Sequence, residues 1–586
     1  MIFRRNENVE QTPRRRFGCL RGCLISLAIY FGLCALGGIL FGSMFEESAT
    51  RLEDNSVYCL RLNGQLMEQA PVDSPWEDLL TSMPGYETQA VLGLDDIISN
   101  IRLAKTNDKI KGIYLYDGQL AMGQASAKAI RDALLDFKTS GKWIIAYSQH
   151  YGQSNYYIAS VADQVLVNPV GTLAWHGLSA QKMYFTRLLE KVGVEMQIVK
   201  VGTFKSAVEP YFRTSMSEAD KMQTELYVQG LWNVMREGVA QSRHLDELYL
   251  DTLADRYMDL QPADEYVRCG LADGLVYTED VDSVLRAWTG TKDYKLVSHR
   301  AMNGVERVKS GVKDKVAILY AEGNITDEMG DGIVGKDVVK LVRKIYKDEH
   351  VKAVVLRVNS GGGSADASEQ IWHAMTTLQQ KGIPVVVSMG DYAASGGYYI
   401  SCEADYIYAE PNTITGSIGI FGTIPNLKKI REKVGIDVDA VNTHEHAGLE
   451  SNMLYEGMNA SERQIMQNMV ERGYDLFTSR CAEGRHMSQE AIKAIGEGRV
   501  WLATDAMKIG LVDGLGNLDD AVLKAAELAG IDSYTIAAYP EKKDFLTELL
   551  ESLEQTDSEE ERIVAKIKAF ASQPRVMAQM EPVQIQ

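Results

Sequence analysis

The chain repeats itself once, at an offset of about 240 residues, and this duplication limits the possible folds more than any other feature. The run IKGIYL at 110–115 parallels VKAVVL at 351–356. Further along, GLADG at 270–274 is echoed by GLVDG at 510–514. Because the matching segments keep the same order, the sequence predicts two related structural units in tandem.

The repeated segments also predict the class of each unit. They are short apolar runs rich in β-branched and aromatic residues, which is typical of buried strands. Helical patterns lie between them, at Ala125–Lys138 and Ala365–Gln380. Strands alternating with helices of this length predict α/β domains around largely parallel sheets. We expect a first domain at 46–305 and a second at 306–540.

The N-terminus predicts a membrane anchor. The stub at 1–22 is basic, and Cys23–Phe45 follows as an uncharged, mostly apolar run of 23 residues. That length suits one spanning helix, and the preceding arginines predict a cytoplasmic N-terminus. A cleaved signal peptide is the alternative, but the sequence after the run offers no small-x-small cleavage site. We therefore expect a single-pass protein of the inner membrane with periplasmic domains, if the cell is Gram-negative.

Charge and cysteine spacing exclude several classes of protein. The net charge of −19 argues against a nucleic-acid partner, which would require a basic face. No cysteine stands in a CxxC or Cys/His spacing, so we expect no metal and no cofactor. The tail at 541–586 contains an acidic stretch that fits either a docking helix or a solvated terminal helix.

Ser395 is the candidate nucleophile. It lies in PVVVSMGDYAASGGYYIS at 384–401, where we expect a buried strand to end near Ser388 and a helix to open at Ser395. Backbone N–H groups at such a helix start can stabilise an oxyanion. The alternative is that Ser395 only caps the helix.

A glycine-rich loop precedes this segment. In RVNSGGGS at 357–364, three successive glycines let the backbone approach another group closely. A phosphate-binding loop is the alternative, but the sequence has no GxxxxGK[ST] pattern here. The loop glycines are therefore candidates for backbone donors to a reacting group.

Lys205 is the candidate general base. None of the nine histidines stands in a familiar triad context, and a lysine can serve if burial keeps it neutral. Lys205 lies among small and apolar residues in VGTFKSAVEP at 201–210, after a strand-like run at Met196–Val199. The alternative is an ordinary solvated lysine.

Taken together, these motifs resemble the signal peptide peptidase A family in its long, duplicated form. FKSAVEP, RVNSGGGS, DYAASGGYYIS, TGSIGIFG at 415–422 and GRVWLATDAMKIGLVDGLG at 498–516 carry the resemblance, which runs from about residue 55 to about 540. It implies tandem ClpP/crotonase-like domains, a Ser395/Lys205 dyad, and oxyanion donors among Gly362, Gly363 and Gly396. It also implies a homotetramer that cleaves remnant signal peptides. The sequence departs from the family at Gly361, where a proline is usual.

The two halves complement each other. At the offset that aligns Val192-Gly193 with Val434-Gly435, Lys205 falls opposite Ala447, and Ser395 falls opposite Gln153 or Ser154. One half thus keeps the base and the other keeps the nucleophile, which predicts one active site per chain.

Two other functions remain open from the sequence. An acyl-CoA enzyme would share the crotonase-like fold, but the predicted export and the lack of a basic phosphate-binding cluster disfavour it. An anchored scaffold without catalysis is disfavoured by the presence of both Ser395 and Lys205.

Overall fold

The computed structural model describes residues 50–71, 90–307, 311–328, 332–542, 577–580 and 584–585. The predicted stub, the predicted anchor at 23–45 and most of the predicted tail lie outside these ranges. Within them, no helix combines the length and the apolar character that crossing a bilayer requires.

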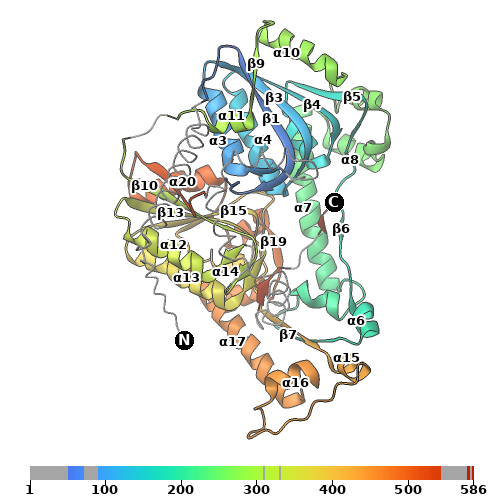
Figure 1. The fold of residues 1–586 in the computed structure, drawn as a ribbon, viewed down its shortest axis with the longest axis vertical. Coiled ribbons are helices and arrows are strands. Elements are labelled where there is room, and N and C mark those ends of the chain that lie inside the picture. The colour runs from blue at the N-terminus through green and yellow to red at the C-terminus, as the bar shows by residue number, and fades with distance from the viewer. Residues whose placement is uncertain are drawn as a thin grey trace, which may run out of the picture.

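The first half of the chain builds a seven-stranded parallel sheet in the order β2-β1-β3-β4-β5-β8, with β9 also paired to β1 (Figure 1). Its strands are β1 (Ser56–Met67), β2 (Val91–Gly93), β3 (Ile110–Ala121), β4 (Trp143–Tyr151), β5 (Gln164–Leu173), β8 (Gly274–Leu275) and β9 (Lys295–Ser298). The sheet ends before residue 305, so the predicted boundary falls between the two main sheets.

The second half builds an eight-stranded sheet with the same core order, β10-β13-β15-β16-β20, and β21 paired to β10. Its strands are β10 (Lys315–Glu322), β13 (Val351–Ser360), β15 (Val385–Ala394), β16 (Tyr406–Ala409), β17 (Ile414–Gly416), β19 (Val500–Leu502), β20 (Gly514–Leu515) and β21 (Thr535–Tyr539). Since β3 and β13 carry the repeated runs, and the strand orders correspond, the predicted duplication is confirmed.

Helices cover both faces of each main sheet. In the first half, α3 (Leu94–Thr106) and α4 (Gln124–Lys138) pack on one face and α10 (Val281–Thr289) on the other. In the second half, α12 (Gly335–Lys347) and α13 (Ala365–Gln380) face α20 (Leu518–Ala529) across the sheet. Strands buried on both faces must be apolar throughout, which explains the continuous runs seen in the sequence.

A third sheet, which the sequence did not predict, joins the two halves. Its order is β12-β11-β14-β22-β18-β7, and it mixes parallel and antiparallel pairs. Its strands are β7 (Glu195–Lys200), β11 (Ile325–Thr326), β12 (Ile333–Val334), β14 (Gly362–Ser364), β18 (Phe421–Asn426) and β22 (Met577–Gln579). The pairing of β7 with β18 brings the chain just before Lys205 into the second half.

A buried ion pair joins the halves at a second place. Arg357, on β13, donates from Nε and Nη2 to the Glu68 carboxylate at 2.9 and 3.1 Å, and both side chains are 3% exposed. Asn359 donates to the same carboxylate at 3.2 Å. Burial, together with the nearby Glu68 charge, raises the pKa of Glu322 to about 7. Because these charged groups are shielded from water, each depends on its neighbours in the cluster to compensate its charge.

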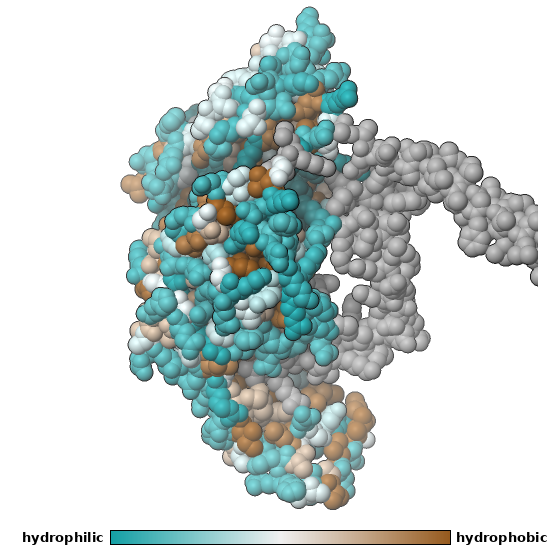
Figure 2. Space-filling model, turned by 90° about the vertical axis from the view of Figure 1, so that its left-hand side faces the viewer, coloured by the Kyte–Doolittle hydropathy of each residue, from teal (hydrophilic) through white to brown (hydrophobic). Residues whose placement is uncertain are grey.

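Exposed apolar side chains gather at the end of the molecule that carries α15 (Lys428–Lys433) and α16 (Leu449–Tyr455), at the bottom of Figure 2. Val441 is 99% exposed, and Val434 and Ile436 are 62% and 56% exposed. Leu188, on α6 (Thr186–Val192), is 57% exposed. We call these four residues the α6/α15 patch.

Candidate active site

Ser395 follows the last residue of β15 and precedes a single helical turn, α14 (Gly396–Tyr399). Our prediction that the strand ends near Ser388 was wrong, because its pairing with β17 continues the extended backbone to Ala394. Ser395 has φ of 55° and its N–H donates to the Gly416 carbonyl at 2.7 Å. A non-glycine residue at positive φ is held there by its surroundings, and here the turn buries the side chain.

Lys205 reaches the same place from the first half of the chain. The third sheet directs β7 toward the second half, and the Phe204 N–H then donates to the Glu497 carbonyl at 2.9 Å. At Gly498, φ is +76° and an added Cβ would lie 2.6 Å from Lys205 Cβ. Only a glycine leaves room for this close approach, so Gly498 lets the lysine enter the second half.

The two side chains are in contact. Lys205 Nζ lies 2.7 Å from Ser395 Oγ, and the two residues are 1% and 0% exposed. Burial lowers the pKa of Lys205 well below its ordinary value. A buried amine with a lowered pKa can be neutral and accept a proton from a hydroxyl, so this geometry can activate a serine.

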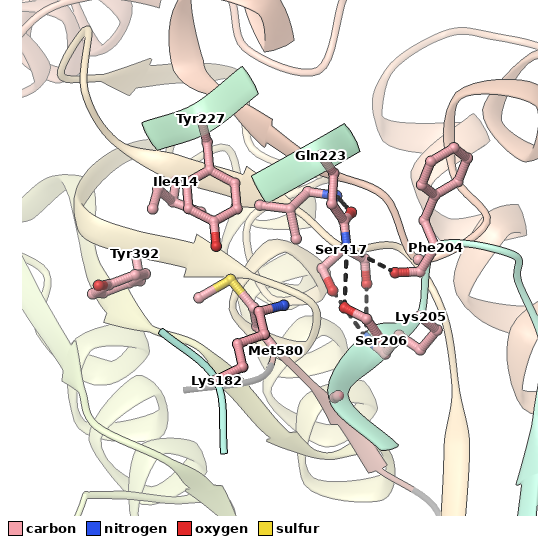
Figure 3. A pocket seen from close by; sticks show the side chains of 13 residues that line it. Lys182, Phe204, Lys205, Ser206, Gln223, Tyr227, Tyr392, Ile414, Ser417 and Met580 are labelled. Atoms are coloured by element: carbon pink, nitrogen blue, oxygen red, sulfur yellow. Dashed lines mark hydrogen bonds between the residues drawn. The ribbon is translucent and has the colours of Figure 1, made fainter. Parts of the chain in front are cut away.

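Ser417 and Gln223 hold Lys205 and its neighbours in place (Figure 3). We did not single out either residue from the sequence. Ser417 offers both its carbonyl oxygen and its hydroxyl to Lys205 Nζ, each at 3.0 Å. Gln223, on α7 (Glu218–Arg243), donates to the Ser206 hydroxyl at 3.0 Å and accepts from the Val500 N–H at 3.1 Å. Ser417 lies in the TGSIGIFG motif, which was a signal; Gln223 gave none, because an isolated glutamine in a helix is unremarkable.

Two of the candidate donor glycines, Gly362 and Gly396, converge beside Ser395. A Cβ built on Gly362 would lie 2.7 Å from the Gly396 nitrogen, so these two backbones nearly touch. Gly362 has φ of +102°, and its N–H donates to the Ser360 hydroxyl at 3.1 Å. Gly363 pairs with Ile325 of β11. The Gly362 N–H thus has an acceptor within the loop.

Gln153 and Ser154, which the repeat places opposite Ser395, form hydrogen bonds within the first half of the chain. Gln153 accepts from the backbone N–H groups of His176 and Gly177 at 2.8 and 3.1 Å. Ser154 accepts from Gln124 at 3.1 Å. Ala447, opposite Lys205 in the repeat, is exposed. Lys205 and Ser395 come together within one chain.

Across the part of the chain that the structure describes, no group of three His, Cys, Asp or Glu side chains is placed to hold a metal ion. The chemistry available at the site comes from the serine hydroxyl, the lysine amine and the backbone N–H groups. This set of groups is sufficient for nucleophilic acyl transfer.

Comparison with known proteins agrees with the twofold repeat of the chain. The model of the family "Peptidase family S49" matches residues 136–291 and residues 377–532, so each half of the chain matches once. Protease 4 from Haemophilus influenzae is 34% identical over 526 residues, covering 87% of this chain and 85% of that protein. A putative signal peptide peptidase SppA from Enterococcus faecium is 29% identical over 304 residues, covering 47% of this chain and 83% of that protein.

Among solved structures, the chain is similar to a mutant of ClpP1 from Listeria monocytogenes. The TM-score is 0.24 at 17% identity, and the match covers 35% of this chain and 94% of that chain. The ClpP/crotonase-like assignment of the two domains stays a prediction.

Proposed function

The chain belongs to peptidase family S49 and is a serine protease, and on this premise we propose that Ser395 is its nucleophile and Lys205 its general base. The 2.7 Å contact between Lys205 Nζ and Ser395 Oγ, inside a site that lowers the lysine pKa, is the observation that carries the proposal.

The proposed reaction passes through an acyl-enzyme. Neutral Lys205 takes the hydroxyl proton as Ser395 Oγ attacks the scissile carbonyl carbon. The lysine ammonium then gives the proton to the departing amine as the peptide bond breaks. Lys205 next activates a water molecule that hydrolyses the ester. Ser417 holds the amine in line through contacts of 3.0 Å.

The oxyanion needs donors close to Ser395, and Gly396 and Gly363 are the proposed sources. Gly396 follows the nucleophile directly, where a backbone N–H can reach the attacked carbonyl. Gly362 would contribute only if its N–H left the Ser360 hydroxyl.

A fluorophosphonate probe tests the nucleophile. We expect the probe to label the wild-type chain at Ser395, identified by mass spectrometry of the labelled peptide. Labelling should be lost in Ser395→Ala and greatly slowed in Lys205→Ala, since the lysine activates the hydroxyl. Labelling at another serine, or none, would contradict the assignment of Ser395 as the nucleophile.

The activity should depend on the protonation of Lys205. We expect kcat/KM to rise with pH as the lysine loses its proton, since only the neutral amine accepts the Ser395 proton. Because burial lowers the pKa of Lys205, the plateau should begin well below the free value near ~10.4. A pH–rate profile with a fluorogenic peptide measures this, and a profile that still rises without levelling at pH 10 would contradict it.

Cleaved signal peptides are the proposed substrates. The name of the Enterococcus relative supports this, as does the family resemblance. Mass spectrometry of products from a synthetic signal peptide gives the test. We expect several internal cleavages in the signal peptide and none in a folded protein that is added as a control.

We also propose that residues 23–45 anchor the protein in the inner membrane with the two domains outside the cytoplasm. Protease added to spheroplasts should then digest the chain beyond the anchor and leave a fragment near residues 1–45. A cytoplasmic protein serves as the control for intact membranes. Protection of the second half of the chain would overturn this topology.

A homotetramer is the proposed assembly, on the resemblance to the family. The α6/α15 patch supports self-association, since exposed apolar side chains of this number on one end commonly mark an interface.

A further inference from the structure

A cavity of about 590 Å³ lies between the two halves of the chain, and we call it the junction cavity. Its walls are α3 and α4 of the first half and α20, β10 and β21 of the second half (Figure 1). Among the residues that the structure describes, none lines both this cavity and the pocket that contains Lys205. The volume is in the range that small-molecule ligands occupy in proteins.

The lining of the junction cavity includes both exposed and buried charged side chains. Arg102 on α3 and Asp519 on α20 form an ion pair between the halves, and both side chains are exposed. Glu68, Arg357 and Glu410 also line the cavity, and all three are buried. The cavity therefore extends from the solvent to the buried ion pair that joins the two halves.

Negative charge exceeds positive charge along this lining. Seven carboxylates and three guanidinium groups line the cavity, and three lysines of the described chain contact those carboxylates. Asp95 and Asp96 share one of these lysines, Lys542, whose Nζ lies 3.0 and 2.7 Å from them. Burial, together with the Asp96 charge, raises the pKa of Asp95. A second cation beside this pair would stabilise its ionised form.

A second pair of carboxylates, Asp132 and Glu410, shares Lys128. The Lys128 Nζ lies 3.3 Å from Glu410 Oε2 and contacts Asp132 more closely. Glu410 is 2% exposed, and its other oxygen, Oε1, accepts no hydrogen bond from the described part of the chain. Burial raises the pKa of Glu410. A buried acceptor without a donor costs free energy, which a bound N–H group would recover.

Apolar side chains form much of the remaining lining, among them Ile98 on α3, Ala133 on α4 and Val522 on α20. Methylene groups are stabilised against such a surface, whereas a hard metal ion needs a shell of oxygen ligands. The described residues do not form such a shell anywhere from His, Cys, Asp or Glu side chains. The lining therefore favours an organic cation in which aliphatic carbon separates the positive charges.

We propose that the junction cavity binds a linear aliphatic polyamine, with one ammonium group at Asp132 and Glu410 and another at Asp95 and Asp96. The first ammonium group donates to Glu410 Oε1, and the carbon chain packs on the apolar walls. Glu410 belongs to the second half and the three aspartates belong to the first, so the ligand links the two halves. Because it binds the folded arrangement of both halves, it also stabilises the folded chain.

Isothermal titration calorimetry with spermidine tests the site in the full-length chain. We expect saturable binding, and a thermal midpoint of unfolding that rises with the spermidine concentration. Octanediol, a neutral chain of similar length, and Mg²⁺ at the same ionic strength should bind much more weakly. Absence of saturable spermidine binding overturns the proposal. Equally tight binding of octanediol or of Mg²⁺ overturns it too, because the site would then not recognise charge and aliphatic carbon together.

A charge variant places the ligand at Glu410. Glu410→Gln keeps the shape of the side chain and removes its charge, and it should raise the Kd for spermidine by about tenfold or more, the usual scale for a lost hydrogen bond to a charged group. Glu483→Gln makes the same change in an exposed pair with Arg480 and should leave the Kd unchanged. If the Glu410→Gln and Glu483→Gln chains bind spermidine equally tightly, the proposal is wrong.

A steric variant tests the cavity without changing any charge. Ala133 is half-buried and lines the cavity, so the ring in Ala133→Phe can occupy the space that the ligand needs. We expect this variant to lose spermidine binding, while Ala447→Phe, at an exposed position, binds like the wild-type chain. Thermal unfolding without ligand checks that both variants are folded. Spermidine binding that is equally tight in both variants would show that the ligand lies elsewhere, and the proposal would fail.

Discussion

Replacing either Ser395 or Lys205 by Ala is expected to lower kcat/KM for peptide hydrolysis by about 10⁴- to 10⁶-fold, because a nucleophile and its base act as one unit. Lys205→Arg should be equally inactive, since a guanidinium does not lose its proton at usable pH. Hydrolysis of a fluorogenic peptide measures the loss, and thermal unfolding of each variant checks that it is folded.

The decisive control is the double variant Lys205→Ala/Ala447→Lys. It restores a lysine at the repeat-related position, which is exposed in the second half. We expect no recovery of activity, because the contact with Ser395 is made by a residue that enters from the first half. Recovered hydrolysis, or a Lys205→Arg variant that keeps wild-type activity, would remove Lys205 as the base.

Replacing Glu68 by Ala is expected to lower the free energy of unfolding by about 3–5 kcal/mol, because it leaves the Arg357 guanidinium buried without its carboxylate. Asn359 would lose the same partner, and its side chain also accepts from the Tyr392 N–H at 3.2 Å, three residues before Ser395. We therefore expect the activity of the remaining folded enzyme to fall as well. Urea unfolding at neutral pH measures the stability.

Two variants test whether the loss comes from the unpaired charge. Glu68→Met/Arg357→Met removes both charges and should be less destabilised than Glu68→Ala, although Ser388 then loses its bond to Arg357. Asp136→Ala removes the partner of Lys105 in a more exposed pair, and should cost less than about 1 kcal/mol. If Asp136→Ala and Glu68→Ala cost the same, burial of the pair does not explain its effect.

Much of the fold could be predicted because short stretches of sequence indicate where its strands and helices lie. The runs at 110–115 and 351–356 became β3 and β13, and Ala365–Gln380 became α13 with the same bounds. Strands buried between helices must be apolar on both faces, so composition alone reveals them. The extent of β15 was missed because small residues such as Ala393 and Ala394 carry little strand preference, and pairing with β17 decides their conformation.

The active site depends on contacts between residues that lie far apart in the sequence. Three features could be predicted before the fold was known: Ser395 follows a strand near glycines, Lys205 lies among apolar residues, and the two stand in opposite halves of a duplicated chain. The contact between their side chains depends on long-range strand pairing. The pairing of β7 with β18 and the missing side chain at Gly498 bring the amine to the hydroxyl, and burial there lowers its pKa. The same holds for β22, because its partners lie more than 150 residues away and pairing across such a distance leaves no periodic mark in the strand's own sequence.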